Sequence, residues 1–113
     1  MNIENPIFIN AVLIGPIFII AGIILLKFPP KKINYLYGYR TKNSMKSEAN
    51  WNFSQKYSAR IMVILGLIYS SFLLILANFK INETIGLILS LGLMFIMCFG
   101  IFYLTEKKLR KGK

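Results

Sequence analysis

The chain has no histidine and no aspartate, and its only acidic residues are Glu4, Glu48, Glu83 and Glu106. A Ser-His-Asp or Cys-His catalytic group therefore cannot form, and zinc sites lack their usual nitrogen and sulfur ligands. No Walker or dinucleotide-binding glycine motif occurs. The four glutamates are widely spaced, and those that lie among lysines are expected to form salt bridges rather than a catalytic pair. We expect no enzyme activity, no metal and no cofactor.

Cysteine is also scarce, with Cys98 as the single example. One cysteine excludes an intramolecular disulfide. Because Cys98 lies within a long apolar run, we interpret it as a small packing residue.

Charge is nearly absent from three long windows. Residues 5–28 contain one charged residue, Lys27, and residues 61–79 and 84–105 contain none. Each window holds about 20 residues, which at about 1.5 Å per residue matches the roughly 30 Å hydrocarbon core of a bilayer. The sequence predicts an all-α integral membrane protein, a single domain of residues 1–113 with transmembrane helices over residues 7–28, 59–79 and 84–104.

Two alternatives to this assignment are disfavoured. Helices of a soluble bundle carry a polar face, and these windows have none. A cleaved signal peptide begins with basic residues, whereas no lysine or arginine precedes Lys27.

Positive charge is abundant but unevenly distributed. Of 14 lysines and arginines, only Lys80 lies outside residues 27–60 and the tail, residues 105–113. Three spans place these two segments on the same side of the membrane, and short basic loops stay cytoplasmic. We therefore expect the N-terminus outside, the C-terminus inside and no direct nucleic-acid partner, although a net charge of +10 in a soluble chain would suggest one.

The segment between the first two spans, residues 29–60, is basic and aromatic. Met45, Ala49 and Phe53 recur every four residues, which predicts an amphipathic helix over residues 44–57 lying at the inner leaflet. The tyrosines on either side of Gly38 suit an interfacial anchor or a binding surface, and the pattern leaves both open.

Small residues recur four apart in the later spans, as Gly66 with Ser70 and Gly86 with Ser90. This spacing allows close approach of membrane helices, and we favour packing within the chain over a dimer seam. The oligomeric state stays open. The short turn of residues 80–83 makes the second and third helices antiparallel neighbours, with Asn82 as the predicted N-cap of the third.

The stretches PPKKIN, YGYRT and SMKSEANWNFSQKY, which begin at Pro29, Tyr37 and Ser44, resemble the SdpI/YfhL family of small bacterial membrane proteins. The family's named member is a six-span immunity protein that shields the producing cell from a secreted toxic peptide and draws a repressor to the membrane. This chain resembles only its C-terminal portion. The resemblance implies a multi-pass protein of the bacterial inner membrane and a recognition surface made of the following residues: Asn34, Tyr37, Gly38, Tyr39, Arg40, Thr41, Ser44, Met45, Trp51 and Tyr57.

These observations favour an immunity or signal-receptor protein, acting in toxin resistance or signal transduction, whose partners are the lipid bilayer and either a toxic peptide or a repressor-like cytoplasmic protein. Arg40 would be its polar anchor, with Tyr37, Tyr39 and Trp51 as contact area. The alternatives are a docking platform for an acidic cytoplasmic regulator, a small channel or transport subunit that uses residues such as Ser70 and Ser90, and a plain interfacial anchor.

Overall fold

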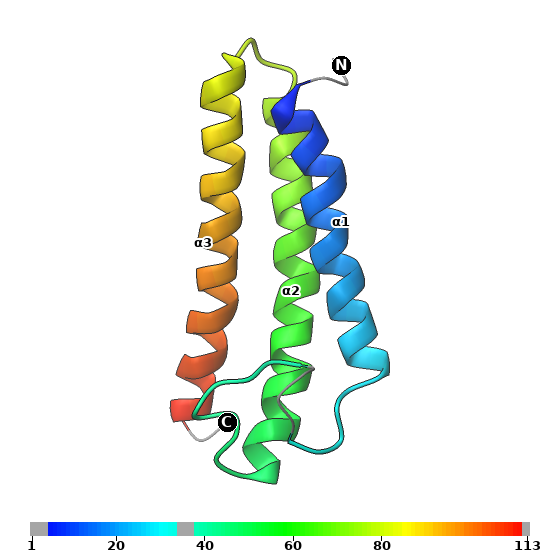
Figure 1. Cartoon of the computed structure of the whole chain (residues 1–113), viewed down its shortest axis with the longest axis vertical. Helices are drawn as coiled ribbons and strands as arrows, with labels where there is room; N and C mark the ends of the chain where they lie inside the picture. The colour runs from blue at the N-terminus through cyan, green and yellow to red at the C-terminus, as the bar shows by residue number, and fades with distance from the viewer. Residues whose placement is uncertain (1–4, 34–37, 112–113) are drawn as a thin grey trace.

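The computed structural model describes residues 5–33 and 38–111, which form three long helices: α1 (Pro6–Lys27), α2 (Glu48–Leu76) and α3 (Glu83–Arg110). The molecule is elongated, with extents of 49 × 24 × 20 Å. The start of α1 and the α2–α3 turn lie at one end, and the connector, which we define as the described residues 28–33 and 38–47, lies with the C-terminal end of α3 at the other (Figure 1).

All three helices are long and apolar enough to cross a membrane, which confirms the predicted three-span, all-α architecture. The bounds of α1 fall within one residue of the prediction. α2 has 29 residues and α3 has 28, so each is about 43 Å long at about 1.5 Å per residue, well beyond a hydrocarbon core of roughly 30 Å. α2 and α3 are therefore longer than a span requires, and apart from Glu83 the parts that lie outside the uncharged windows, residues 48–60 and 106–110, are at the connector end.

The predicted separate interfacial helix over residues 44–57 is not present. Residues 48–57 are the first turns of α2, which continues without a break into the span. Ser47 caps this helix by accepting a hydrogen bond from the Asn50 N–H at 3.0 Å. No proline or glycine follows until Gly66, so nothing interrupts the helix.

The other helix starts follow from local sequence. The Asn5 side chain accepts a hydrogen bond from the Ile7 N–H at 2.9 Å, and Pro6 occupies the first helical position. The predicted N-cap of the third helix is confirmed, because the Asn82 Oδ1 atom accepts from the Thr84 N–H at 2.8 Å.

Small residues bring α1 and α2 together along the membrane-spanning part. A Cβ added at Gly66 would lie 2.8 Å from the Ile19 Cγ1 atom and 2.9 Å from the Gly15 carbonyl oxygen. The Ser70 hydroxyl donates to the Ala11 carbonyl at 2.7 Å. Across the bundle, a Cβ at Gly86 of α3 would lie 3.0 Å from Ile7. The small-residue pairs thus serve packing within the chain, as predicted.

A buried polar cluster joins the three helices in the half of the bundle nearer the α2–α3 turn. Ser90 of α3 is fully buried. Its hydroxyl accepts a hydrogen bond from the Asn10 amide of α1, and its carbonyl accepts one from the Tyr69 hydroxyl of α2 at 2.7 Å. Such interhelical hydrogen bonds satisfy polar groups that lipid cannot.

The close approach of α1 and α2 makes Gly66 intolerant of a larger residue. Gly66→Ala should lower the free energy of unfolding by about 1–3 kcal/mol, because the added methyl would force α1 and α2 apart. The matched control is Gly92→Ala, where nothing lies within 4 Å of an added Cβ, and which should unfold at or slightly above the wild-type temperature. Thermal unfolding in detergent measures both, and an unchanged midpoint for Gly66→Ala would contradict the packing described.

Candidate functional site at the connector

The connector is fixed to the first turns of α2 by Trp51. This side chain is fully buried, and its indole Nε1 donates to the Pro30 carbonyl oxygen at 2.8 Å. A buried tryptophan needs such a partner for its N–H. The sequence analysis assigns Trp51 contact area for a partner; in the structure of the chain itself, Trp51 is part of the packing that holds the connector in place.

One turn further along α2, Gln55 holds the backbone of the connector at Tyr39. The Tyr39 N–H donates to Gln55 Oε1 at 2.6 Å, and Gln55 Nε2 donates to the Tyr39 carbonyl at 2.7 Å. The amide thus satisfies both backbone groups, much as a neighbouring β-strand would. The preceding Gly38 has a φ of +99°, and a Cβ there would collide with Gln55 Oε1. Glycine is required at this position for both reasons.

The next residues close a tight turn around Ser44. The Thr41 N–H donates to Ser44 Oγ at 2.7 Å, and the Ser44 N–H donates to Thr41 Oγ1 at 3.1 Å. The Met45 N–H completes the turn by donating to the Thr41 carbonyl at 3.0 Å. Ser44 is fully buried. Its hydroxyl is engaged in this turn, which explains why the helix begins after Ser47 rather than at Ser44.

A carboxylate from α3 ties this turn to the rest of the molecule. Glu106 Oε2 accepts hydrogen bonds from the Tyr39 hydroxyl at 2.6 Å and from Thr41 Oγ1 at 2.7 Å. Its other oxygen, Oε1, accepts from Asn43 Nδ2 at 2.8 Å. Only 7% of Glu106 is exposed. The predicted salt bridge to lysine is replaced at Glu106 by three neutral donors, all from the connector.

The surroundings of Glu106 favour its charged form. Burial alone would raise the pKa of its carboxyl group, but the hydrogen bonds from Tyr39, Thr41 and Asn43 and the nearby charge of Arg110 lower the pKa below its ordinary value. Burial, together with the negative charge of Glu106, raises the pKa of the Tyr39 hydroxyl. At neutral pH, Tyr39 therefore remains a donor and Glu106 an acceptor.

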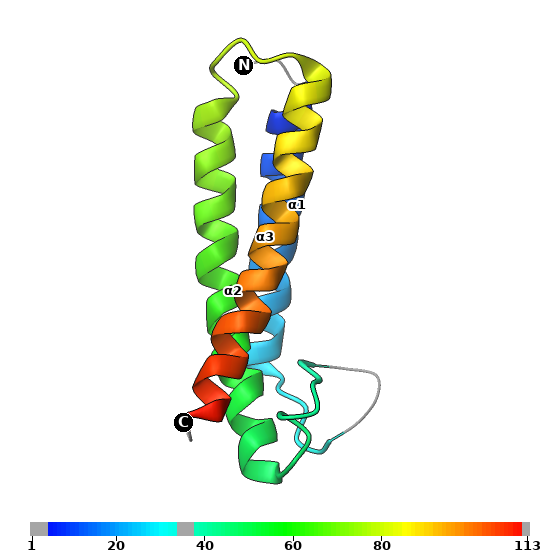
Figure 2. The ribbon, with the colours of Figure 1, turned by 90° about the vertical axis from the view of Figure 1, so that its left-hand side faces the viewer.

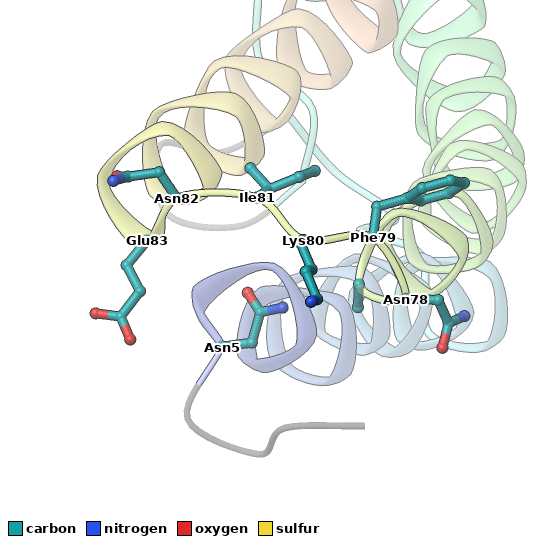
Figure 3. Close-up of a pocket in the computed structure, with 8 residues that line it drawn as sticks. Asn5, Asn78, Phe79, Lys80, Ile81, Asn82 and Glu83 are labelled. Atoms are coloured by element: carbon teal, nitrogen blue, oxygen red, sulfur yellow. The ribbon is translucent and has the colours of Figure 1, made fainter.

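The opposite end of the molecule has a cavity of about 530 Å³, beside the N-terminus of α1 and the α2–α3 turn (Figure 3). Polar and charged side chains of both helix starts and the turn border it, and its lining residues are Asn5, Ala77, Asn78, Phe79, Lys80, Ile81, Asn82 and Glu83. The sequence analysis did not predict this cavity, because residues that line it, such as Asn5 and Asn82, lie far apart in the chain.

A family model described as the SdpI/YfhL protein family matches residues 31–104. The chain belongs to the SdpI/YfhL family. It is also 42% identical, over 96 residues, to a protein of Bacillus subtilis strain 168 named "Uncharacterized protein YfhL", covering 85% of this chain and 82% of that protein. No solved structure matches it.

The residues that carry the SdpI/YfhL resemblance fall into four groups in the structure. Asn34 and Tyr37 lie outside the described residues. Gly38, Tyr39, Thr41, Ser44 and Trp51 hold the connector through the contacts given above. Met45 and Tyr57 are half-buried, and the Tyr57 ring stacks on Phe53 with centroids 5.4 Å apart. Arg40 alone among the described signature residues is exposed.

Two residues essential to this arrangement were missed by sequence reasoning. Gln55 and Glu106 supply the side-chain contacts that connect α2 and α3 to the connector. No spacing rule links Glu106 to Tyr39, 67 positions away. The only sequence signal is that Glu106 is an acid in an otherwise basic tail. In the part of the chain described by the structure, no group of three His, Cys, Asp or Glu side chains is placed to hold a metal ion.

Replacing the buried carboxylate should release the connector. Glu106→Gln removes the charge and places an NH₂ group among donors, and a hydrogen bond to a charged group contributes about 1.5–3 kcal/mol. We expect faster trypsin cleavage after Lys42 and Lys46 in the purified protein. Glu48→Gln removes the same charge from an exposed residue at the same end. Trypsin should cleave this variant at the wild-type rate. Equal cleavage of the two variants would contradict the role assigned to Glu106.

Acid should have the same effect. The pKa of Glu106 is lower in the folded chain than its ordinary value of 4.5, so its contribution to stability is complete above that value and is lost as the pH falls through the folded-state pKa. Protection of the connector, measured by acid-stable pepsin at low pH and trypsin near neutrality, should be constant from pH 7 to about pH 5 and then fall. Glu106→Gln should lack this fall between pH 5 and strong acid.

Proposed function

We propose that this SdpI/YfhL member is a membrane-bound immunity or signal-receptor protein that acts against a secreted toxic peptide. Its resemblance to the family's immunity protein supports this assignment. The observation that carries it is the position of Arg40: its neighbours Tyr39 and Thr41 are fixed to α2 and α3, while Arg40 itself is exposed. A planar guanidinium on a rigid base suits recognition of a carboxylate, a phosphate or a helix C-terminus.

The distribution of charge supports an orientation with the connector and tail in the cytoplasm. The basic side chains described at the connector end are all exposed: Lys27, Lys31, Lys32, Arg40, Lys42, Lys46, Lys56, Arg60, Lys107, Lys108, Arg110 and Lys111. The opposite end has only Lys80. By the positive-inside rule the connector end would be cytoplasmic and the cavity of Figure 3 would face outward.

In this orientation the two ends would have different tasks. A secreted peptide would reach the outer end and the lipid-facing helix surfaces. A cytoplasmic partner would meet the connector around Arg40. α3 runs from the α2–α3 turn to the connector end (Figure 2). At that end its Glu106 holds Tyr39 and Thr41. A shift of α3 would therefore alter the connector, which is the minimum that a receptor needs.

A docking platform for an acidic cytoplasmic regulator is the second candidate, and the exposed cations favour it directly. The two functions are compatible, because a receptor must pass its signal to a partner. A channel or transport subunit has less support: Ser70 donates to the Ala11 carbonyl, and Ser90 is buried in the cluster with Asn10 and Tyr69. Neither serine is left to line an open path.

The immunity proposal predicts survival. Expression of the chain in a toxin-sensitive host should increase survival against the toxic peptide produced by a strain that carries a related immunity gene. Arg40→Ala should reduce that protection, whereas Arg60→Ala, which removes another exposed cation at the same end, should retain it. Membrane levels of each variant serve as the control for insertion. Equal survival with and without the inserted wild-type chain would refute the immunity assignment for that toxin.

Reporter fusions would test the orientation on which this proposal depends. A reporter that is active only in the cytoplasm should be active when joined after Lys111 and inactive when joined before Asn5. The reverse pattern would place Arg40 outside the cell and exclude a cytoplasmic partner.

A further inference from the structure

We propose that a cleft between the start of the connector and α2 binds the headgroup of an anionic phospholipid. The cleft has a volume of about 340 Å³ and lies between the residues that follow α1 and the first turns of α2. It is lined by Pro29, Pro30, Lys31, Asn52, Gln55 and Lys56. This inference does not depend on the proposed immunity function.

The walls of the cleft are preformed. The Pro30 carbonyl on one side is fixed by the indole N–H of the buried Trp51. Gln55 on the other side is fully buried and is held by both of its hydrogen bonds to Tyr39. A ligand entering the cleft would not have to order these groups, and the binding cost is correspondingly lower.

The charges at the cleft specify an anion. Lys31 of the connector and Lys56 of α2 border it from its two walls, and both are exposed. Asn52, one turn before Lys56, adds an exposed side-chain amide that can donate a hydrogen bond. Among the described residues that line the cleft there is no glutamate. The nearest acid along α2 is Glu48, one turn before Asn52 and two turns before Lys56.

The position of the cleft selects phospholipid among anions. It lies directly after Lys27, the last residue of α1, and beside Lys56, just before the apolar part of α2 begins. That is the level at which a bilayer presents its phosphates, and basic groups there attract anionic lipids. A cleft of about 340 Å³ accommodates a phosphate and its glycerol but not a folded acidic protein. The lysine stems can extend along acyl chains while their ammonium groups reach the phosphate.

Lipid retention tests the proposal. The full chain, purified from membranes and incubated with equal amounts of phosphatidylglycerol and phosphatidylcholine, should retain phosphatidylglycerol preferentially in native mass spectrometry. Lys31→Ala/Lys56→Ala should weaken that retention at least about tenfold, which corresponds to about 1.4 kcal/mol. Lys42→Ala/Lys46→Ala removes two exposed lysines elsewhere in the connector and should retain the lipid as the wild type does.

Each other outcome overturns the assignment. Equal loss in both double variants would show a general charge effect rather than a site, and no preference for phosphatidylglycerol in the wild type would exclude an anionic-lipid site. Displacement of the lipid by millimolar inorganic phosphate would assign the cleft to a soluble phosphate instead. Lys31→Arg/Lys56→Arg keeps both charges and should preserve retention, and an unchanged fluorescence spectrum of the single tryptophan, Trp51, confirms that the connector is folded in every variant.

Discussion

The buried carboxylate of Glu106 is the interaction on which the connector end of this molecule depends. Its two oxygens accept hydrogen bonds from Tyr39, Thr41 and Asn43. Those three residues belong to the segment between α1 and α2, while Glu106 belongs to the end of α3. A buried charge is costly unless it is fully hydrogen-bonded, so the carboxylate is stable in this position only when all three donors are in place. One side chain thus makes the conformation of the connector conditional on the position of α3.

This contact is possible because α2 and α3 are longer than the membrane is thick. Had both helices ended at the bilayer surface, the connector would have had only lipid headgroups to pack against. Instead, Trp51 and Gln55 on α2 and Glu106 on α3 project from helical turns that lie beyond the apolar core. A polar backbone segment that leaves the membrane needs partners for its N–H and C=O groups, and these extensions supply them. Helix length and connector structure are therefore two aspects of one arrangement.

Almost all of the membrane-spanning part could be predicted from the sequence, because that part follows from local rules. Each of its signals lies within a single segment of the chain. These signals are uncharged windows of the right length, small residues four apart and Asn82 before the third helix. The structure of the connector could not be predicted in this way, and the reason is physical. A helix over residues 44–57 was predicted from a four-residue period, yet Ser44 is held by Thr41 in a turn, and Trp51 packs under Pro30. These contacts, and the one between Tyr39 and Glu106, are tertiary, so no period in the sequence reveals them. Gly38 is explained by its own backbone, whose φ of +99° lies in the region that favours glycine.

The structure also changes how the family signature should be interpreted. Gly38, Tyr39, Thr41, Ser44 and Trp51 are occupied by contacts within the chain, so their presence is explained by the fold and is not in itself evidence for a ligand. Substituting any of them would disturb the connector and would reduce function for structural reasons alone. Evidence for recognition must come from residues that the fold does not require, and Arg40 is the described signature residue that meets this condition. Because its backbone neighbours are held from both sides by Gln55 and Glu106, a partner that binds Arg40 binds a position whose stability is set by the helices. Recognition at the connector and packing of the helices would then be linked through the same few hydrogen bonds.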